Sequence, residues 1–561
     1  MATGHAPVEA SRLSPRTATA AATPMSGPVR SATCMVATAH PAASEVALSV
    51  LRQGGHAVDA AVAAQAVLGV VEPQASGLGG GGLLLVWTGG DRKLVFIEGL
   101  ARAPADVPED WLAGRDVALL QRSGLVVGVP GVVRTLALAH RRYGRLSWDA
   151  LFADAIRIAE DGFPLPRYLH ACLRQRPELA RKPPFAGAYF QPDGSPRPVG
   201  TILRNPDLAT TLRMVAADPE AFYRAPFATM LARAVAEDAN PGAMRESDLA
   251  AYPPVERAPV AITAFGHRIV SAASPVSGGV TLLQQLATLE RLGIADAAPG
   301  SAEAAHLMLE AGRLTREDRR RWLGDPDQVA VPTAGLLDPA YLDARAALVD
   351  RDRASAVFSA GTPPGTDAAS VASDPVAHTA TSHLSIIDAG GNAVAFTTTI
   401  NQLFGSDIVA GGLVLNDALT NFAEQPVRQG RRVLNAIAPN KRPITTMAPT
   451  IVFGADDRPL LVLGAGGGAR IIDAVAQTIL GVLAWGQDVR SAVEAPRFGA
   501  QNGPIELEQG TAAASLAPAL LRLGHAPEIV EMNAAVQAVM RDRPGLAAWA
   551  DPRRDGAARG D

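Results

Sequence analysis

The sequence predicts an α+β protein in which β-sheets are packed between helical layers. Apolar residues recur with a 3.6-residue period, which predicts helices at residues 42–53, 148–160, 302–323 and 471–483. Short apolar and β-branched runs predict strands at residues 83–87, 95–97, 260–264, 450–453 and 460–463. Because these strands are grouped apart from the helices, layered sheets with helices on their outer faces are expected.

Composition excludes several classes of protein. The chain has 561 residues and is too long for one ordinary domain. Its net charge of −4 and pI of about 6.2 argue against a nucleic-acid partner. The two cysteines, Cys34 and Cys172, cannot build a disulfide framework. The ten histidines show no ligand spacing, so no metal and no other cofactor is expected.

The first 33 residues are rich in Ala, Ser, Thr and Pro and lack the continuous apolar core of a secretory signal. They are expected to form a disordered leader, and the protein is expected in the cytoplasm. The longest apolar run, residues 60–71, is interrupted by Gln65 and is too short to span a bilayer. No membrane partner is therefore expected.

A predicted hairpin between Thr381 and Asn401 carries the most chemical information. Its two apolar strands flank the glycine pair 390–391, which tolerates the backbone angles of a tight turn. A turn centred on this pair places Thr381 opposite Thr399, Ile400 or Asn401. Thr381 is thus a candidate nucleophile, at the first position of a strand and facing a polar cluster.

The segment before Thr381 strengthens this hypothesis. Residues 359–380 are rich in Gly, Pro, Ser, Thr and Asp, have no apolar period, and are expected to form a flexible connector. A cut between Ala380 and Thr381 would give Thr381 a free α-amine, the base that an N-terminal threonine nucleophile uses. Threonines are also common in ordinary strands, so a purely structural role is the alternative.

Motifs along nearly the whole chain carry a family resemblance. They include Met-Val-Ala-Thr-Ala-His-Pro at 35–41, Gly-Gly-His-Ala-Val-Asp-Ala-Ala at 54–61, Val-Glu-Pro-Gln-Ala-Ser-Gly-Leu-Gly-Gly-Gly-Gly at 71–82, Gly-Val-Pro-Gly at 128–131, Ser-Gly-Gly at 277–279, Leu-Gly-Asp-Pro at 323–326, Asn-Lys-Arg-Pro at 440–443, Met-Ala-Pro-Thr at 447–450 and Asp-Pro-Arg at 551–553. Together with the Thr381 segment, they resemble the γ-glutamyltransferase family of N-terminal nucleophile hydrolases.

The resemblance implies an architecture and a mechanism. The fold would be a four-layer α/β/β/α sandwich formed from two subunits of one precursor, residues 34–380 and 381–561. The Thr381 hydroxyl would first attack the Ala380 carbonyl and cut the chain, and would then attack a small-molecule amide substrate. By the same resemblance, Thr399 orients the nucleophile and Asn401 binds substrate.

A glycine-rich loop at residues 464–469 has two interpretations. Gly-Ala-Gly-Gly-Gly-Ala matches the G-x-G-x-x-G/A fingerprint of dinucleotide-binding proteins. However, the preceding strand is expected in a hairpin, and a second helix at 489–495 follows where a parallel strand is required. An oxyanion hole is the favoured interpretation, because glycine N–H groups at a helix start can approach a substrate closely. By resemblance, Gly467 and Gly468 form it.

The family's carboxylate-binding site is altered in this chain. Its clamping arginine lies in an Arg-Glu-x-Ala-Pro run, and here Leu100 stands at that position. Arg102, two residues further on, is a candidate replacement, because it would share a face with Leu100 in an extended segment. Thr445 and Thr446 stand where the family has two carboxylate-binding serines, so hydroxyl donors are retained.

The amine-binding site is altered as well. The family pattern Asn-Asn-Gln-Met-Asp-Asp-Phe corresponds to residues 416–422, where Asn421 replaces the key aspartate and Ala418 a glutamine. A bidentate arginine and a carboxylate make charge-assisted contacts that hold a free amino acid, each worth about 1.5–3 kcal/mol. Affinity for a glutamyl group is therefore expected to be low.

The sequence thus predicts an autoprocessed amidohydrolase or acyltransferase with an altered glutamyl site. The Leu100 and Asn421 combination resembles the branch that includes cephalosporin acylases, and other divergent members hydrolyse oxamate. Two alternatives stay open: a true γ-glutamyl hydrolase or transpeptidase acting on glutathione, and an uncleaved scaffold used only for binding. His383 shares a strand face with Thr381 but is interpreted as structural, because the α-amine already serves as the base.

Overall fold

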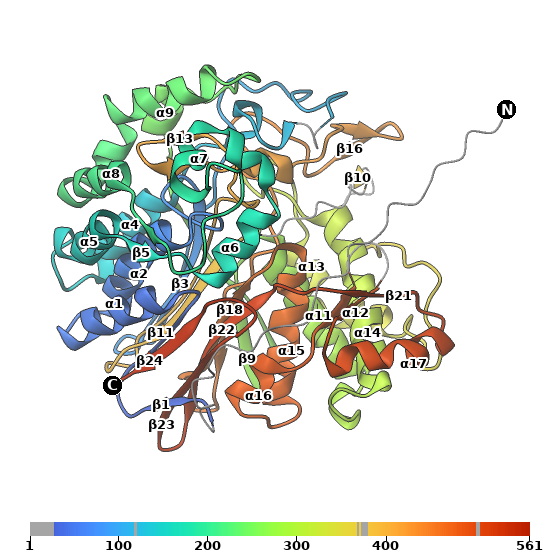
Figure 1. The fold of residues 1–561 in the computed structure, drawn as a ribbon. Coiled ribbons are helices and arrows are strands. Elements are labelled where there is room, and N and C mark those ends of the chain that lie inside the picture. Colours follow the sequence, from blue (N-terminus) through green and yellow to red (C-terminus); the bar gives the residue numbers. More distant parts are fainter. Residues whose placement is uncertain (1–26, 117–119, 367–369, 372–379, 501–504) are drawn as a thin grey trace.

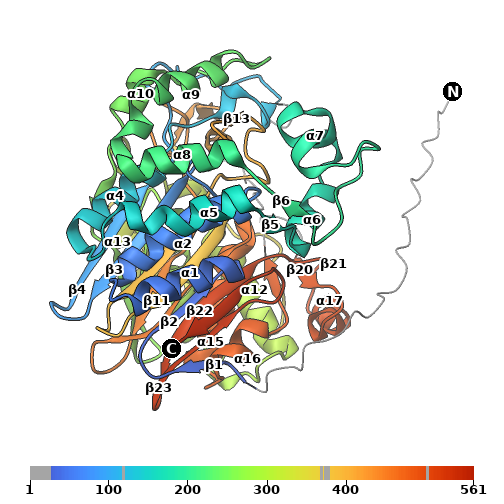
Figure 2. The ribbon, with the colours of Figure 1, turned by 60° about the vertical axis from the view of Figure 1, so that its left-hand side comes forward.

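Two seven-stranded β-sheets lie face to face at the centre of the protein, and helices cover both outer faces (Figures 1 and 2). The computed structural model describes residues 27–116, 120–366, 370–371, 380–500 and 505–561. The sheets meet where strands β11 (Ser382–Ile387) and β12 (Ala393–Thr399) pack against β18 (Pro459–Gly466). This arrangement confirms the predicted four-layer α/β/β/α sandwich.

The first sheet holds the predicted nucleophile strand near its centre. Its order is β24-β2-β11-β12-β3-β4-β7, and every neighbouring pair is antiparallel. The remaining strands of this sheet are β2 (Met35–Thr38), β3 (Gly81–Thr88), β4 (Lys93–Gly99), β7 (Val255–Arg257) and β24 (Ala557–Gly560). Strands β2 and β24, from the two ends of the chain, therefore lie together on the side of β11 opposite β12.

The second sheet carries the glycine-rich loop at the end of β18. Its order is β1-β23-β22-β18-β17-β9-β8, again antiparallel throughout. The other strands are β1 (Val29–Ser31), β8 (Val260–Ala264), β9 (His267–Ser271), β17 (Thr450–Phe453), β22 (Ala535–Asp542) and β23 (Gly545–Ala550). Because β18 is antiparallel to both neighbours, the loop lacks the parallel βαβ context of a dinucleotide site, as expected.

Each sheet has its own helical cover. The first is covered by α1 (Pro41–Arg52), α2 (Ala57–Val71) and α4 (Val132–Tyr143), with α5 (Ala153–Asp161) and α8 (Pro206–Ala217) stacked behind α2. The second is covered by α11 (Ser277–Arg291), α15 (Ile471–Leu483) and α16 (Val489–Glu494), with α12 (Ala302–Trp322) behind α11. Figure 2 shows α8, α5, α2 and α1 lying over the first sheet.

Shorter elements complete the described chain. The helices are α6 (Arg167–Arg174), α7 (Pro183–Tyr189), α9 (Phe227–Ala236), α10 (Glu246–Ala250), α13 (Thr333–Leu336), α14 (Pro339–Ala346) and α17 (Ala517–Arg522). The strands are β5 (Phe163–Pro164), β6 (Ile202–Leu203), β10 (Ser370–Val371), β13 (Val409–Ala410), β14 (Leu413–Val414), β15 (Val427–Arg428), β16 (Arg431–Val433), β19 (Phe498–Ala500), β20 (Ile505–Glu508) and β21 (Pro527–Val530).

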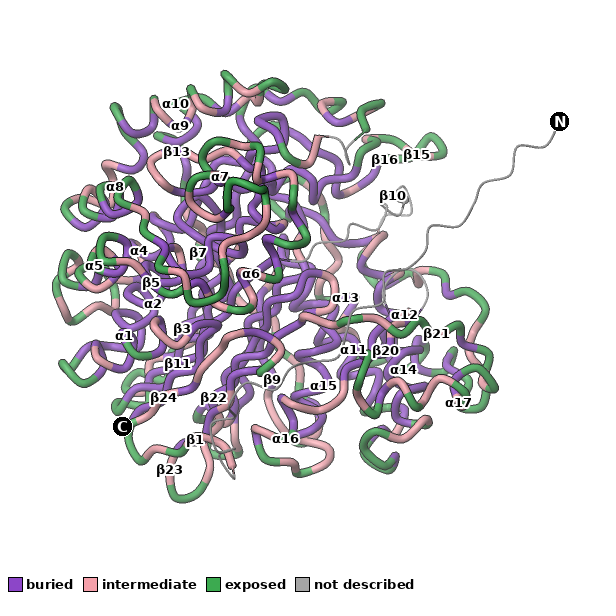
Figure 3. The backbone as a smooth tube through the Cα atoms, in the orientation of Figure 1, coloured by how far each residue is buried: buried purple, intermediate pink, exposed green. Residues whose placement is uncertain are grey.

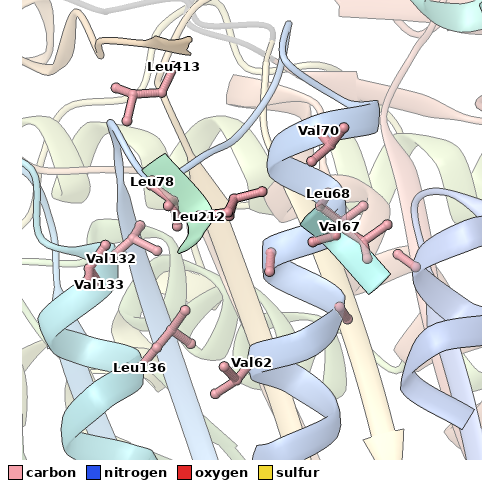
Figure 4. Close-up of a cluster of buried hydrophobic side chains, with 14 of the residues drawn as sticks. Val62, Val67, Leu68, Val70, Leu78, Val132, Val133, Leu136, Leu212 and Leu413 are labelled. Atoms are coloured by element: carbon pink, nitrogen blue, oxygen red, sulfur yellow. The ribbon is translucent and has the colours of Figure 1, made fainter. Parts of the chain in front are cut away.

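Helix α2 is buried almost all round because it lies between the first sheet and the α5/α8 layer. Figure 4 shows its Val62, Val67 and Leu68 in one apolar cluster with Leu136 of α4 and Leu212 of α8. Figure 3 shows the same pattern across the molecule, with buried backbone in both sheets and exposed backbone at the periphery. No helix in the described part of the chain is both long and apolar enough to cross a membrane.

Three expectations need adjustment. The predicted leader, residues 1–33, is too long, because Val29–Ser31 pair with β23; residues 1–26 lie outside the described residues. The predicted helix 148–160 is split into a 3₁₀ turn, Asp149–Phe152, and α5. Within the predicted connector, Ser370–Val371 pair with β16, while residues 367–369 and 372–379 lie outside the described residues.

Candidate active site

The β11–β12 hairpin has one of the registers expected from its turn. Ser382 pairs with Thr398, which places Thr381 directly opposite Thr399. The Asp388 side chain fixes the turn by accepting hydrogen bonds from two turn N–H groups, at 2.8 and 3.0 Å. The turn therefore sets which polar side chain faces the predicted nucleophile.

The Thr381 hydroxyl lies against the carbonyl that it is predicted to attack. Thr381 is almost completely buried, and its Oγ1 contacts the carbonyl oxygen of Ala380. The same Oγ1 lies 3.3 Å from Thr399 Oγ1, and Thr399 donates a 3.0 Å hydrogen bond to the Ala380 carbonyl oxygen. Thr399 thus contacts both the predicted nucleophile and the carbonyl that it is predicted to attack, and its hydrogen bond polarises that carbonyl.

Asn401 and Asn421 extend this network away from the nucleophile. The Asn401 N–H donates to Thr399 Oγ1 at 2.8 Å, from a backbone with a φ of 84°. Its Oδ1 accepts a 3.0 Å hydrogen bond from Asn421 Nδ2, and its Nδ2 donates to Thr420 Oγ1 at 2.9 Å. The two asparagines therefore hold each other in place beside Thr399.

The glycine loop passes next to the nucleophile. A Cβ at Gly466 would lie only 1.9 Å from the Thr381 carbonyl oxygen, so no side chain fits there. The next two residues, Gly467 and Gly468, have φ values of 141° and 63°, and their N–H groups donate to no acceptor within the described residues. Thr446 Oγ1 fixes the loop by donating to the Gly468 carbonyl oxygen at 2.9 Å. Two available N–H donors beside a candidate nucleophile are the arrangement that an oxyanion hole needs.

His383 is engaged elsewhere. It is fully buried, with Nδ1 at 2.7 Å from Thr397 Oγ1 and Nε2 at 3.0 Å from Ser385 Oγ. Burial lowers its pKa to about 3, so the ring is neutral at physiological pH. Since both ring nitrogens are occupied by strand hydroxyls, the geometry agrees with the structural interpretation of His383.

A small pocket opens beside Thr399. In the part of the chain that the structure describes, no charged side chain lines it. The lining residues are Gly81, Leu100, Ala101, Thr399, Asn401, Ala418, Asn421, Pro443, Thr445 and Met447. The pocket therefore offers neutral hydrogen-bonding groups on an apolar background.

Arg102 does not belong to this pocket lining. Its backbone pairs with Val129 in an isolated antiparallel bridge beyond the end of β4. The Arg102 guanidinium donates to the Ala251 carbonyl oxygen at 3.0 Å and lies 5.5 Å from the centre of the Tyr252 ring. Leu100 lines the pocket whereas Arg102 does not, so the structure gives no support to a role for Arg102 as a substitute clamp.

Two buried charged residues near the nucleophile escaped the sequence analysis. Arg554 Nη1 donates to the Thr381 carbonyl oxygen at 2.6 Å, and Glu72 Oε2 accepts from Ser382 Oγ at 2.5 Å. Both lie in or beside motifs that carried the family resemblance, but nothing in the local pattern connected them to Thr381. Among the described residues, no three His, Cys, Asp or Glu side chains gather to hold a metal ion.

Comparison with known proteins places this site in context. The family model described as gamma-glutamyltranspeptidase matches residues 43–560. The glutathione hydrolase proenzyme of Bacillus subtilis strain 168 is 37% identical over 478 residues, 83% of this chain and 80% of that protein. The acylase ACY 1 proenzyme of Pseudomonas sp. strain SE83 is 35% identical and covers 88% and 86%. The crystal structure of a cephalosporin acylase from Bacillus halodurans has a TM-score of 0.83 at 26% identity, covering 96% and 98%.

Proposed function

Because this chain belongs to the gamma-glutamyltranspeptidase family, we propose that it is an autoprocessed N-terminal threonine amidohydrolase with a neutral acyl-binding pocket. The observation that carries the proposal is the contact of the Thr381 hydroxyl with the Ala380 carbonyl, which Thr399 also holds. The contact keeps the hydroxyl beside the carbonyl group, and such proximity favours an intramolecular attack on the carbonyl carbon.

Self-cleavage would proceed in two steps. The Thr381 hydroxyl oxygen bonds to the Ala380 carbonyl carbon, the bond from that carbon to the Thr381 nitrogen breaks, and the hydroxyl proton passes to the nitrogen. Water then hydrolyses the resulting ester, which returns the Thr381 hydroxyl and leaves Ala380 as a carboxylate. The products are a large subunit ending at Ala380 and a small subunit beginning at Thr381.

Turnover would use the same hydroxyl on a substrate amide. The new α-amine of Thr381 accepts the hydroxyl proton, and the N–H groups of Gly467 and Gly468 stabilise the oxyanion of the tetrahedral intermediate. The amine of the substrate leaves, and water or an acceptor amine releases the acyl group. Thr399 and Asn401 orient the nucleophile and the acyl group.

The pocket favours an acyl group without the charged head of an amino acid. Leu100 and Asn421 stand where a glutamyl site has an arginine and a carboxylate, Ala418 stands where it has a glutamine, and Arg102 lies away from the lining. The neutral side chains of Asn401, Asn421 and Thr445 can hydrogen-bond an amide or, weakly, a carboxylate of the acyl group. The proposed substrates are glutaryl-type, oxamate-like and other small acyl amides, with hydrolysis favoured over transfer.

Glutathione hydrolysis is the second candidate, because a relative with the name glutathione hydrolase proenzyme covers most of this chain. Parallel kcat/KM measurements with γ-glutamyl-p-nitroanilide, glutaryl-p-nitroanilide and oxamate distinguish the two. We expect the γ-glutamyl donor to be the poorest, since two charge-assisted contacts of about 1.5–3 kcal/mol each are absent. A clear preference for the γ-glutamyl donor would contradict the proposed specificity.

A gain-of-function pair sharpens this test. Leu100→Arg with Asn421→Asp restores both charges and should raise kcat/KM for the γ-glutamyl donor at least about tenfold relative to the glutaryl donor. Arg102→Ala is the matched control and should leave the donor preference unchanged, because Arg102 lies outside the pocket lining. A changed preference in Arg102→Ala would return that residue to the substrate site.

A further inference from the structure

Glu72 is a buried carboxylate that is hydrogen-bonded to Ser382, the residue after the predicted nucleophile. It caps the C-terminus of α2 and is 2% exposed. Its Oε2 accepts from the hydroxyl of Ser382, the residue that directly follows Thr381, and its Oε1 lies 3.4 Å from Gln74 Nε2. The proposed mechanism gives this carboxylate no task, although its position links α2 to the nucleophile strand.

The other groups that face Glu72 do not neutralise it. Arg554 is the nearby cation, but its Nη1 and Nε donate to backbone carbonyl oxygens, and no cation lies within ion-pair distance of Glu72 in the described part of the chain. Asp555, Tyr168 and Cys172 complete the surroundings, and a negative charge on any of them would oppose ionisation of Glu72. The Arg554 guanidinium also lies 4.7 Å from the centre of the Tyr168 ring.

This environment resists a negative charge on Glu72 in the uncut chain. Burial raises the pKa of the carboxyl to about 7, despite the opposing effect of Arg554 and the Ser382 hydrogen bond. The C-terminal end of a helix also carries partial negative charge, which disfavours a carboxylate at that position. A titratable group buried at such a cost beside a reacting bond is typical of a functional site.

Self-cleavage supplies the missing positive charge. The uncut chain has an uncharged amide nitrogen at Thr381, whereas the product has an α-amine, whose ordinary pKa is about 8. When the ester intermediate is hydrolysed, the new Ala380 carboxyl group releases a proton and the amine can take one. The resulting ammonium forms in a site where Thr381 is 3% exposed, so water solvates it poorly and a nearby carboxylate is needed.

We propose that Glu72 is a positioning residue that acts as the counter-charge for the Thr381 α-amine, during self-cleavage and in the mature enzyme. The inference rests on the proposed self-cleavage at Thr381. Ionised Glu72 stabilises positive charge that develops on the departing Thr381 nitrogen, so self-cleavage quickens as Glu72 loses its proton. In the mature enzyme, the same carboxylate raises the pKa of the α-amine, which must be neutral to act as a base.

Glu72→Gln tests both effects, because it keeps the size and hydrogen-bonding capacity of the side chain and removes its charge. In the wild type, the rate of self-cleavage should rise with pH through about 7. In Glu72→Gln it should be at least about tenfold slower above pH 7 and lose this dependence. The rate is measured between pH 5.5 and 9 from the loss of the full-length band on denaturing gels.

The pH profile of the mature enzyme distinguishes an effect of the Glu72 charge from a purely structural role, which would leave that profile unchanged. Removing the carboxylate lowers the pKa of the α-amine, so the acid limb of kcat/KM should shift to lower pH by roughly one to two units. Glu72→Asp retains a charge and should keep both pH dependences, though with altered rates. Glu45→Gln, at an exposed glutamate on α1, is the matched control and should behave like the wild type.

The outcomes separate this inference from the proposed function. A wild-type chain that never cuts itself contradicts the proposed function. A wild type that cuts normally, together with a Glu72→Gln variant of unchanged rate and pH profile, overturns only the role of Glu72. If Glu72→Asp instead loses both pH dependences while folding with wild-type thermal stability, charge at this position is not the cause and the inference also fails.

Discussion

Thr381→Ala should remain a single full-length chain without amidase activity. The substitution removes the Thr381 hydroxyl that contacts the Ala380 carbonyl oxygen. Thr399 remains and keeps its hydrogen bond to the same oxygen. Because self-cleavage and turnover use the same atom, both should be lost together. Denaturing gels over several days and assays with the p-nitroanilide donors measure the two effects.

Two companion variants make this result specific. Thr381→Ser keeps the hydroxyl and, after cleavage, the α-amine, so it should still cut itself and retain measurable turnover. Thr397→Ala removes a neighbouring strand hydroxyl that bonds His383 rather than the scissile carbonyl, and cleavage should persist. Cleavage of Thr381→Ala at the same bond would contradict the assignment of the nucleophile.

Gly468→Ala keeps the N–H group but should move it out of position, and turnover should fall by up to about 10²–10³, the usual cost of losing one oxyanion-hole donor. The φ of Gly468 is 63°, a left-handed backbone that a residue with a Cβ adopts at a cost of roughly 1–2 kcal/mol. The new side chain should therefore displace the loop beside Thr381 while the sheet stays intact. kcat for the best amide donor and the thermal midpoint of unfolding are measured together.

Gly486→Ala is the matched control for backbone strain. Gly486 has a φ of 62° and open space where a Cβ would lie, and it belongs to the loop after α15. Both variants should lose similar stability, but only Gly468→Ala should lose turnover. Equal kinetic losses in the two, or normal turnover in Gly468→Ala, would show that the loop does not stabilise an oxyanion.

Local sequence patterns predicted the centre of the site well. The glycine turn limited the hairpin to a few registers, and the observed one places Thr381 opposite Thr399. The hairpin of β17 and β18 was visible as two apolar runs around a turn, which correctly argued against a parallel dinucleotide-binding unit. Both predictions depend on short-range geometry that neighbouring residues determine.

The same local patterns could not predict contacts between residues that are far apart in the sequence. Glu72 and Ser382 are 310 positions apart, and only the docking of α2 on β11 brings their side chains together. The contact of Arg102 with Ala251, 149 positions away, is likewise set by packing that the local pattern does not contain. The end of the leader was missed because Val29–Ser31 gain their strand structure from β23, near the other end of the chain.

The mass of the purified wild-type protein tests the central claim most directly. Intact-mass spectrometry with N-terminal sequencing of the separated subunits should find a large subunit ending at Ala380 and a small subunit that begins Thr-Ser-His-Leu and ends at Asp561. A single species with the mass of the uncut chain, in fresh and aged samples alike, would contradict self-cleavage and with it the proposed enzyme.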